Sequence, residues 1–274
     1  MLRHPWNTDF VWRRPQISPR SLSTAQLDAF HTDGCLVVED LIDEESLVAL
    51  RSELDEIEAG VDAFLKTMPD ERLFIAESGA ITFSPHAVLT SAAARAVSTH
   101  PAIVGLCHDL LGPDARLYWD QLVYKKPDRP REFPWHQDNG YTFVEPQQYL
   151  TVWLALTDAT LDNGCPWVVP GLHLGGTLAH EYVDPLGHQC FADHPDAVAT
   201  PVRAGGAVVF SSLTPHRTGP NTSAGVRKAY ILQYAPDGAV KLDGDPTTGA
   251  DPQRVRQDDP DRQYLVVRRG VSAR

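Results

Sequence analysis

The sequence predicts a mainly β fold with flanking helices, in which N-terminal helices pack on a jelly-roll core. Helical signals are concentrated before residue 116, and short runs of β-forming residues follow one another after it. Gly, Pro and Asn clusters separate these runs, a pattern typical of sandwiches and jelly rolls. Helices first and strands afterwards favour a helical layer packed on a β core.

Before residue 116, local signals place each element in turn. Residues 1–22 contain Pro5, Pro15 and Pro19, which prevent a regular helix. We predict a helix from Ser23, as N-cap, to residue 33, a strand over residues 35–38, a helix capped by Asp43, and a helix over residues 101–111 that Gly112 ends. Residues 73–83 are expected to form a strand with a mobile tip at residues 77–79.

After residue 116, we expect strands over residues 117–124, 149–156, 167–169, 207–210 and 229–234. The tail from residue 241 is rich in Asp, Pro and Arg and is expected to be a loop, until a last edge strand over residues 264–268. We therefore predict one domain over residues 1–274, divided into helical support (1–115), jelly-roll core (116–240) and C-terminal tail (241–274).

Composition restricts the partners. The 274 residues are 42% hydrophobic, no apolar run reaches the length of a membrane span, and the first residues lack a secretory apolar region. The four cysteines form no C-x-x-C pair, which is typical of a reduced, cytoplasmic protein. The net charge of −12 argues against nucleic acid. We expect a small-molecule substrate, no nucleic-acid or membrane partner, and a monomer or homodimer.

The chemistry is expected to centre on His136 and Asp138, which follow the predicted strand 117–124. If both lie on a strand, their side chains point to one face. An imidazole and a carboxylate there supply two of the three ligands of a 2-His-1-carboxylate site, which leaves positions open for a cosubstrate and O2. Two other His-x-Asp triplets, at residues 31–33 and 194–196, lie at a helix end and in a loop, and are not expected to bind metal.

A second histidine from a distant strand would complete such a site. His216 comes just after the buried run 207–212, and Arg227 precedes the next strand. An arginine that faces the interior of a jelly roll needs an anionic partner. A dicarboxylate would supply one through a bidentate pair. Arg203, which also precedes a buried strand, is the next candidate for this role.

Four ordered segments resemble the phytanoyl-CoA dioxygenase family of Fe(II)/2-oxoglutarate oxygenases. They are WHQDNGY at residues 135–141, TVWLALTD at 151–158, DNGCPWVVPGLH at 162–173 and HRTGPNTSAGVR at 216–227. The resemblance covers roughly residues 35–236. It implies a double-stranded β-helix core, with Fe(II) as cofactor, 2-oxoglutarate as cosubstrate and O2 as oxidant.

The resemblance also implies roles for individual residues. His136, Asp138 and His216 resemble the iron ligands and the catalytic centre. The 2-oxoglutarate shell would consist of Arg227, Thr218, Trp153 and Gln121. Asn163 and Gly164 resemble a structural turn, and His173 is expected to be structural. Leu172 departs from the small hydroxyl residue usual before His173, and the lysine that some members use has no counterpart between residues 73 and 84.

These roles imply a dioxygenase that oxidises an unactivated C–H bond of a small molecule, with hydroxylation as the expected outcome and succinate and CO2 as coproducts. Desaturation, cyclisation and epimerisation remain alternatives, whereas Asp138 argues against halogenation. Outside this class, the alternatives are a non-catalytic jelly-roll binding module and a zinc hydrolase. The substrate is expected to contact Phe133, Tyr141, Phe143 and loops 73–83 and 182–194. The low-Lys, Arg- and Pro-rich composition favours tailoring of natural products.

Overall fold

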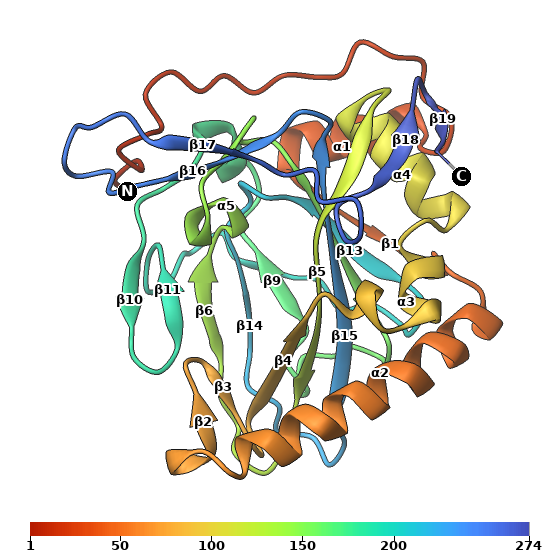
Figure 1. The fold of residues 1–274 in the computed structure, drawn as a ribbon, viewed down its shortest axis with the longest axis vertical. Helices are drawn as coiled ribbons and strands as arrows, with labels where there is room; N and C mark the ends of the chain where they lie inside the picture. The colour runs from red at the N-terminus through yellow and green to blue at the C-terminus, as the bar shows by residue number, and fades with distance from the viewer. Residues whose placement is uncertain (274) are drawn as a thin grey trace.

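A large antiparallel sheet forms the centre of the molecule (Figure 1), as seen in a computed structural model that describes residues 1–273. Its strands, in spatial order, are β1 (Cys35–Val38), β13 (Ala207–Ser211), β8 (Leu150–Ala155), β15 (Arg227–Pro236), β5 (Ala115–Lys125), β4 (Ile81–Pro85), β3 (Ala76–Glu77) and β2 (Arg72–Leu73). Strand β18 (Leu265–Arg268) also pairs with β5 and, on its other side, with β19 (Val271–Ser272).

A second, smaller sheet provides the other wall of the core. It contains β12 (Val198–Ala199), β9 (Pro166–Val168), β14 (His216–Thr218) and β6 (Phe133–His136), in that order. Three further strands pair in the order β17 (Gln253–Arg256), β16 (Val240–Asp243) and β7 (Val144–Glu145), and β10 (Glu181–Val183) and β11 (Gly187–Gln189) form a separate hairpin. Side chains from both main sheets line one cavity, so the two sheets form the walls of a jelly roll.

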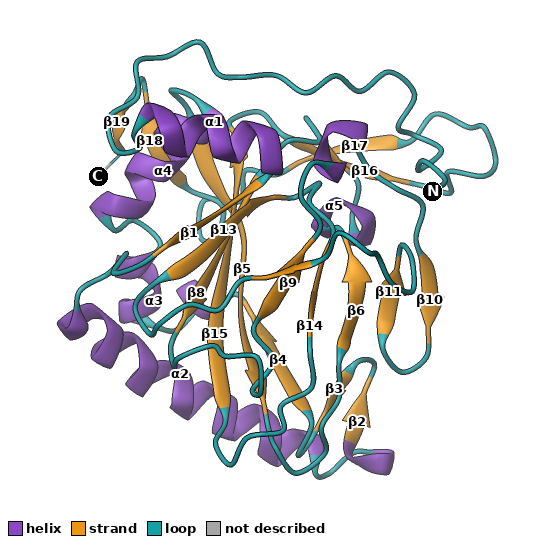
Figure 2. Cartoon of the chain, turned by 180° about the vertical axis from the view of Figure 1, so that it is seen from behind, coloured by secondary structure: helices purple, strands orange, loops and turns teal. Residues whose placement is uncertain are grey.

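Four helices gather on one side of the molecule (Figure 2): α1 (Thr24–Asp33), α2 (Glu44–Leu65), α3 (Ala92–Val97) and α4 (Pro101–Leu111). The short α5 (Asp138–Tyr141) lies apart from them, at the end of β6, and 3-10 turns occur at Pro69–Glu71, Ala87–Leu89 and Leu172–Gly175. Among the described residues, no helix is long and apolar enough to cross a membrane.

Alternation along the strands separates the two faces of the large sheet. On β8, Val152 and Leu154 pack in the same hydrophobic cluster as residues of α1, α2 and α4, whereas Trp153 packs in the cluster between the two sheets. On β15, Leu232 faces the helices and Ile231 faces the interior. The strands are therefore buried on both faces, which explains their nearly continuous apolar sequences.

Most local expectations are confirmed. Ser23 caps α1 with a complete capping box, Asp43 caps α2, and α4 begins at Pro101 and is followed by Gly112. The five predicted core strands are β5, β8, β9, β13 and β15, and the last edge strand is β18. The two sheets with helices on one side confirm the predicted fold class.

Two expectations about the N-terminal half need correction. Strands β1 to β4 belong to the large sheet, so residues 1–115 do more than support the core from outside. The predicted loose tip at residues 77–79 is held by side-chain contacts: Ser78 donates to Asp62 at 2.8 Å, and Glu77 pairs with Arg131 at 2.8 Å. These contacts fasten the turn to α2 and to the segment before β6.

Candidate metal centre

Three side chains converge between the sheets, as predicted: His136 at the end of β6, Asp138 at the start of α5 and His216 at the start of β14. One ligand atom from each lies within 4.8 Å of the others. Asp138 Oδ1 is 3.9 Å from His136 Nε2 and 3.7 Å from His216 Nε2. His136 and His216 are register partners on neighbouring strands, which explains their proximity.

The prediction that strand alternation places Asp138 on the same face as His136 is wrong. Strand β6 ends at His136, and Asp138 begins a helical turn. The chain therefore bends between the two residues, and this bend, not strand alternation, brings the carboxylate to the imidazole. The bend is anchored by Gln137, whose side-chain amide donates to Gly176 O at 3.1 Å and whose oxygen accepts from Leu178 N at 2.6 Å.

Hydrogen bonds behind the three ligands decide which atom each one offers. His136 Nδ1 lies 2.8 Å from Pro134 O, and His216 Nδ1 lies 3.0 Å from Thr214 O. A carbonyl can only accept, so each Nδ1 carries the proton and each Nε2 presents a free lone pair. The Thr151 hydroxyl donates to Asp138 Oδ2 at 2.5 Å and leaves Oδ1 facing the imidazoles. Such outer contacts are typical of metal sites.

Burial sets the protonation of the cluster. Burial lowers the pKa of His216 to about 4, and burial together with the neighbouring His216 lowers the pKa of His136 well below its usual value. Both imidazoles are therefore neutral near pH 7, which is the form that binds metal. Burial also raises the pKa of Asp138, against the effects of His136 and Thr151. These three residues, with neutral nitrogens and a carboxylate oxygen, fit a divalent transition metal such as Fe(II).

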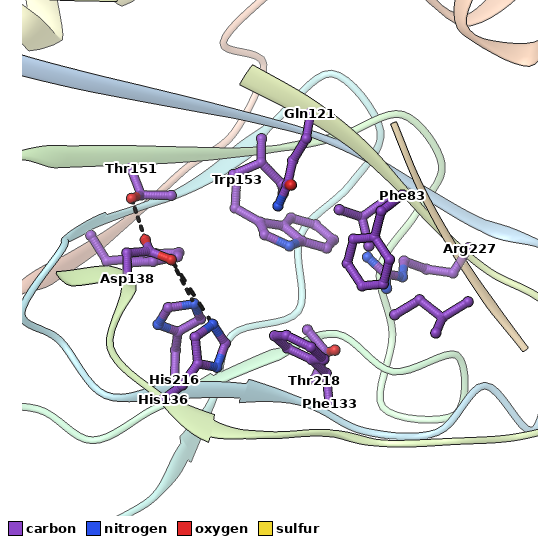
Figure 3. A pocket seen from close by; sticks show the side chains of 14 residues that line it. Phe83, Gln121, Phe133, His136, Asp138, Thr151, Trp153, His216, Thr218 and Arg227 are labelled. Atoms are coloured by element: carbon purple, nitrogen blue, oxygen red, sulfur yellow. Dashed lines mark hydrogen bonds and ion pairs between the residues drawn. The ribbon is translucent and has the colours of Figure 1, made fainter. Parts of the chain in front are cut away.

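Arg227 lies in the same cavity, away from the metal cluster (Figure 3). Its side chain is 1% exposed, and none of its three guanidinium nitrogens has a hydrogen-bond partner. Its guanidinium carbon lies 5.0 Å from the centre of the Trp153 ring. Burial lowers the pKa of Arg227 to about 9. An unpaired, buried cation is costly, so this geometry requires an anion.

The cavity has two chambers that meet at the metal cluster. The smaller one contains Arg227, Thr218 and Trp153, and the larger one, of about 430 Å³, contains Tyr141. Gln121 and Phe133, together with His136 and Asp138, line both. The structure thus brings together all the predicted metal and cosubstrate residues.

Phe143 is the one predicted site residue that does not reach the cavity. Its ring packs against His4 and Trp6, with centroid distances of 4.7 and 5.6 Å. The chain turns after α5, and this turn sends Phe143 towards the N-terminal segment. The alternative anchor Arg203 is also excluded, because its side chain is 67% exposed and pairs with Glu39 and Asp40.

The two loops predicted to border the cavity differ in their contribution. Residues 73–76 and Phe83 line the larger chamber. The segment 182–194 lies behind the wall: His188 N donates to the Tyr141 hydroxyl at 3.1 Å, and a side chain at Gly187 would collide with the same hydroxyl. The second loop therefore supports Tyr141 and does not line the chamber itself.

Three residues that support the site were not predicted from the sequence. Thr151 holds Asp138, and Gln233 lines the larger chamber and hydrogen-bonds Asp138. Period-2 counting from Trp153 and from Arg227 would have placed both on the interior face. Lys125, 1% exposed, donates to the carbonyls of Thr218 and Gly219, so this cation fixes the strand that carries Thr218.

The other histidines named from the sequence lie elsewhere. His31 accepts from Trp12 Nε1 at 3.2 Å, and His194 is near Asp196. His173 is fully buried with its ring edge-on to Trp12 at 4.5 Å, in agreement with a structural role. Within residues 1–273, the cluster at Asp138 is the one group of ligand side chains arranged for a metal.

The chain is similar to known proteins over most of its length. The family described as phytanoyl-CoA dioxygenase (PhyH) matches residues 30–229. Phytanoyl-CoA dioxygenase domain-containing protein 1 of Bos taurus is 28% identical over 259 residues, which cover 77% of this chain and 89% of that protein. Methylphosphonate hydroxylase of Gimesia maris is 29% identical over 218 residues, which cover 78% of this chain and 81% of that protein.

Solved structures show the same fold. The non-heme monooxygenase ThoJ superposes with a TM-score of 0.64 at 28% identity and covers 85% of this chain and 84% of its own. The α-ketoglutarate-dependent epimerase SnoN, from nogalamycin biosynthesis, has a TM-score of 0.67 at 24% identity. The match covers 88% of this chain and 97% of SnoN.

Proposed function

Because the chain belongs to the phytanoyl-CoA dioxygenase family, we propose that it hydroxylates an unactivated C–H bond of a small molecule with Fe(II), 2-oxoglutarate and O2. The family match confirms the expected enzyme class, a non-haem oxygenase that depends on 2-oxoglutarate, and hydroxylation is our proposal within that class. In balance, the substrate C–H becomes C–OH while 2-oxoglutarate and O2 give succinate and CO2.

The single observation that carries the proposal is an unpaired Arg227 in the same cavity as a complete His-Asp-His cluster. A metal hydrolase could use the cluster but would have no use for a buried cation beyond it. A binding module would need neither the converging Nε2 atoms nor the threonine behind Asp138. The cluster would supply the ligands of a metal, and Arg227 would supply the partner of a dicarboxylate.

The contacts in the cavity indicate what the protein would contribute to the reaction and what the iron and cosubstrate would contribute. Iron with its cosubstrate supplies the oxidising power when bound, and the protein supplies position. His136, Asp138 and His216 would hold the metal, with their orientation fixed by backbone carbonyls and Thr151. Arg227 would bind the far carboxylate of 2-oxoglutarate, assisted by the Thr218 hydroxyl, and Trp153 would cover the chain of the cosubstrate.

The decisive assay is succinate release, measured with and without Fe(II), O2 and 2-oxoglutarate. We expect release only when all three are present. Release of a hydrolysis product with zinc and without O2 would instead indicate a hydrolase, and binding of small molecules without succinate would indicate a non-catalytic module. Formation of an alkene, a ring or an epimer in place of an alcohol would keep the class and refute hydroxylation.

The natural-product role expected from composition is also proposed here. Its support is the low-Lys, Arg- and Pro-rich composition of the chain. The cytoplasmic location and the monomeric or dimeric state stay predictions, as does the single-domain organisation.

A further inference from the structure

The larger chamber differs in chemistry from the chamber that contains Arg227. Seven of its sixteen lining residues are Phe, Tyr or Trp, although these types make up 8% of the chain. Its volume of about 430 Å³ is in the range of sites for drug-sized ligands. Aromatic rings on several sides favour a ligand that is itself flat and apolar, because rings stack or meet edge to face.

The polar groups of this chamber are almost all neutral. They come from Gln121, Thr142, Gln233 and the tyrosines. The acidic and imidazole groups of the lining are Asp138 and His136, which belong to the metal cluster. Among the described residues, no Lys or Arg lines the chamber. An anionic group on a ligand would therefore find no cationic side chain among the lining residues, in a protein of net charge −12.

The cations near the chamber are already paired. Arg131 donates to Ile75 O and pairs with Glu77 at 2.8 Å, and Arg72 pairs with Asp184 at 3.4 Å. Arg262 is near enough to Tyr118 for its charge to lower the pKa of that tyrosine against the effect of burial, and it pairs with Asp259 at 2.9 Å. The free cation of the cavity is Arg227, in the other chamber. The two chambers thus separate charge: the dicarboxylate fits one, and an uncharged molecule fits the other.

We infer that the substrate is an uncharged, ring-containing molecule with hydroxyl or carbonyl groups, and neither a coenzyme A thioester nor a phosphonate. The inference rests on the proposed function only in that it takes the occupant of the larger chamber to be the substrate. Neutral side-chain amides and tyrosine hydroxyls would orient such a molecule by hydrogen bonds. The phosphates of coenzyme A and the phosphonate group both need cations that this chamber lacks.

The test uses two tricyclic probes that differ in one group: 2-(hydroxymethyl)anthraquinone, which is neutral, and anthraquinone-2-sulfonate, which is anionic. Calorimetric titration into the full-length protein, loaded with metal and 2-oxoglutarate under nitrogen, gives both affinities without turnover. We expect the neutral probe to bind at least about tenfold more tightly. Neither coenzyme A nor methylphosphonate should displace it.

A charge placed at the chamber mouth gives a second measurement. Leu73 is 39% exposed and lines the chamber, so Leu73→Arg adds a cation without a loss of core packing. We expect this variant to bind the sulfonate at least about tenfold more tightly than the wild type does. Val48→Arg adds the same charge to a 46% exposed position of α2 and is the matched control, which should leave both affinities unchanged.

Equal affinities, tighter binding of the sulfonate by the wild type, or failure of the neutral probe to bind would each overturn the inference. Displacement by coenzyme A or methylphosphonate would do the same. The proposed function has a separate readout, because succinate release tests the oxygenase reaction and probe binding does not. A protein that prefers the neutral probe but releases no succinate would refute the function and retain the assignment of the chamber.

Discussion

Replacing Arg227 with methionine removes the charge while keeping much of the side-chain volume, and it separates cosubstrate binding from metal binding. A charge-assisted hydrogen bond to a carboxylate contributes ~1.5–3 kcal/mol. At about 1.4 kcal/mol per decade, the variant should bind 2-oxoglutarate roughly tenfold to a hundredfold more weakly. Iron should still bind, because Arg227 is not among the three clustered ligands.

The same substitution should not destabilise the protein without cosubstrate. Burial lowers the pKa of Arg227 to about 9, so burying the charged guanidinium without an anion costs folding free energy. Because the pKa is lower in the folded state, this cost is fully present below pH 9 and disappears as the pH rises from about 9 towards 12.5. Arg227→Met should therefore raise the unfolding free energy at pH 7, and by less above pH 9.

Two titrations check this reasoning. Calorimetry with 2-oxoglutarate gives the loss of affinity, and denaturant unfolding at pH 7 and at pH 10 gives the stability difference. Arg227→Lys is the control that keeps a charge, and it should restore affinity only in part, since an ammonium cannot form the planar, bidentate pair. An Arg227→Met variant that binds 2-oxoglutarate as tightly as the wild type would refute the assignment of the anchor.

Three further outcomes follow from the metal cluster and from the loop 73–83. Asp138→Ala should abolish succinate release and weaken iron binding, while circular dichroism shows that the fold is retained. His31→Ala and His194→Ala should keep their iron. Wild-type turnover in Asp138→Ala would exclude the cluster as the metal site. Thr151→Val should lower metal affinity by about tenfold or more in a calorimetric titration, because the carboxylate loses its orienting hydroxyl; unchanged affinity would show that this contact is dispensable. Amide hydrogen exchange in residues 73–83 should slow when the neutral anthraquinone binds, and an unchanged rate would contradict closure of this loop over the ligand.

Local chemistry in the sequence determined much of this protein. The caps at Ser23 and Asp43 and the helix between Pro101 and Gly112 depend on neighbours a few residues away, so the sequence alone locates them. The sequence also placed His136 after the apolar run 117–124 and His216 after the run 207–212. It did not predict β6 and β14, the short strands that carry the two histidines.

Only the tertiary structure decided which side chains meet. Asp138 reaches the imidazoles through a bend after β6, and Phe143 leaves the cavity because the chain turns again after α5. The difference between Arg227 and Arg203 is likewise not local. Arg227 begins β15 and its side chain lies in the cavity between the sheets, whereas the Arg203 side chain pairs with Glu39 and Asp40 at the surface. Pattern gives the face of a strand, whereas strand register and the direction of turns decide what that face meets, because these depend on contacts between residues far apart in the chain.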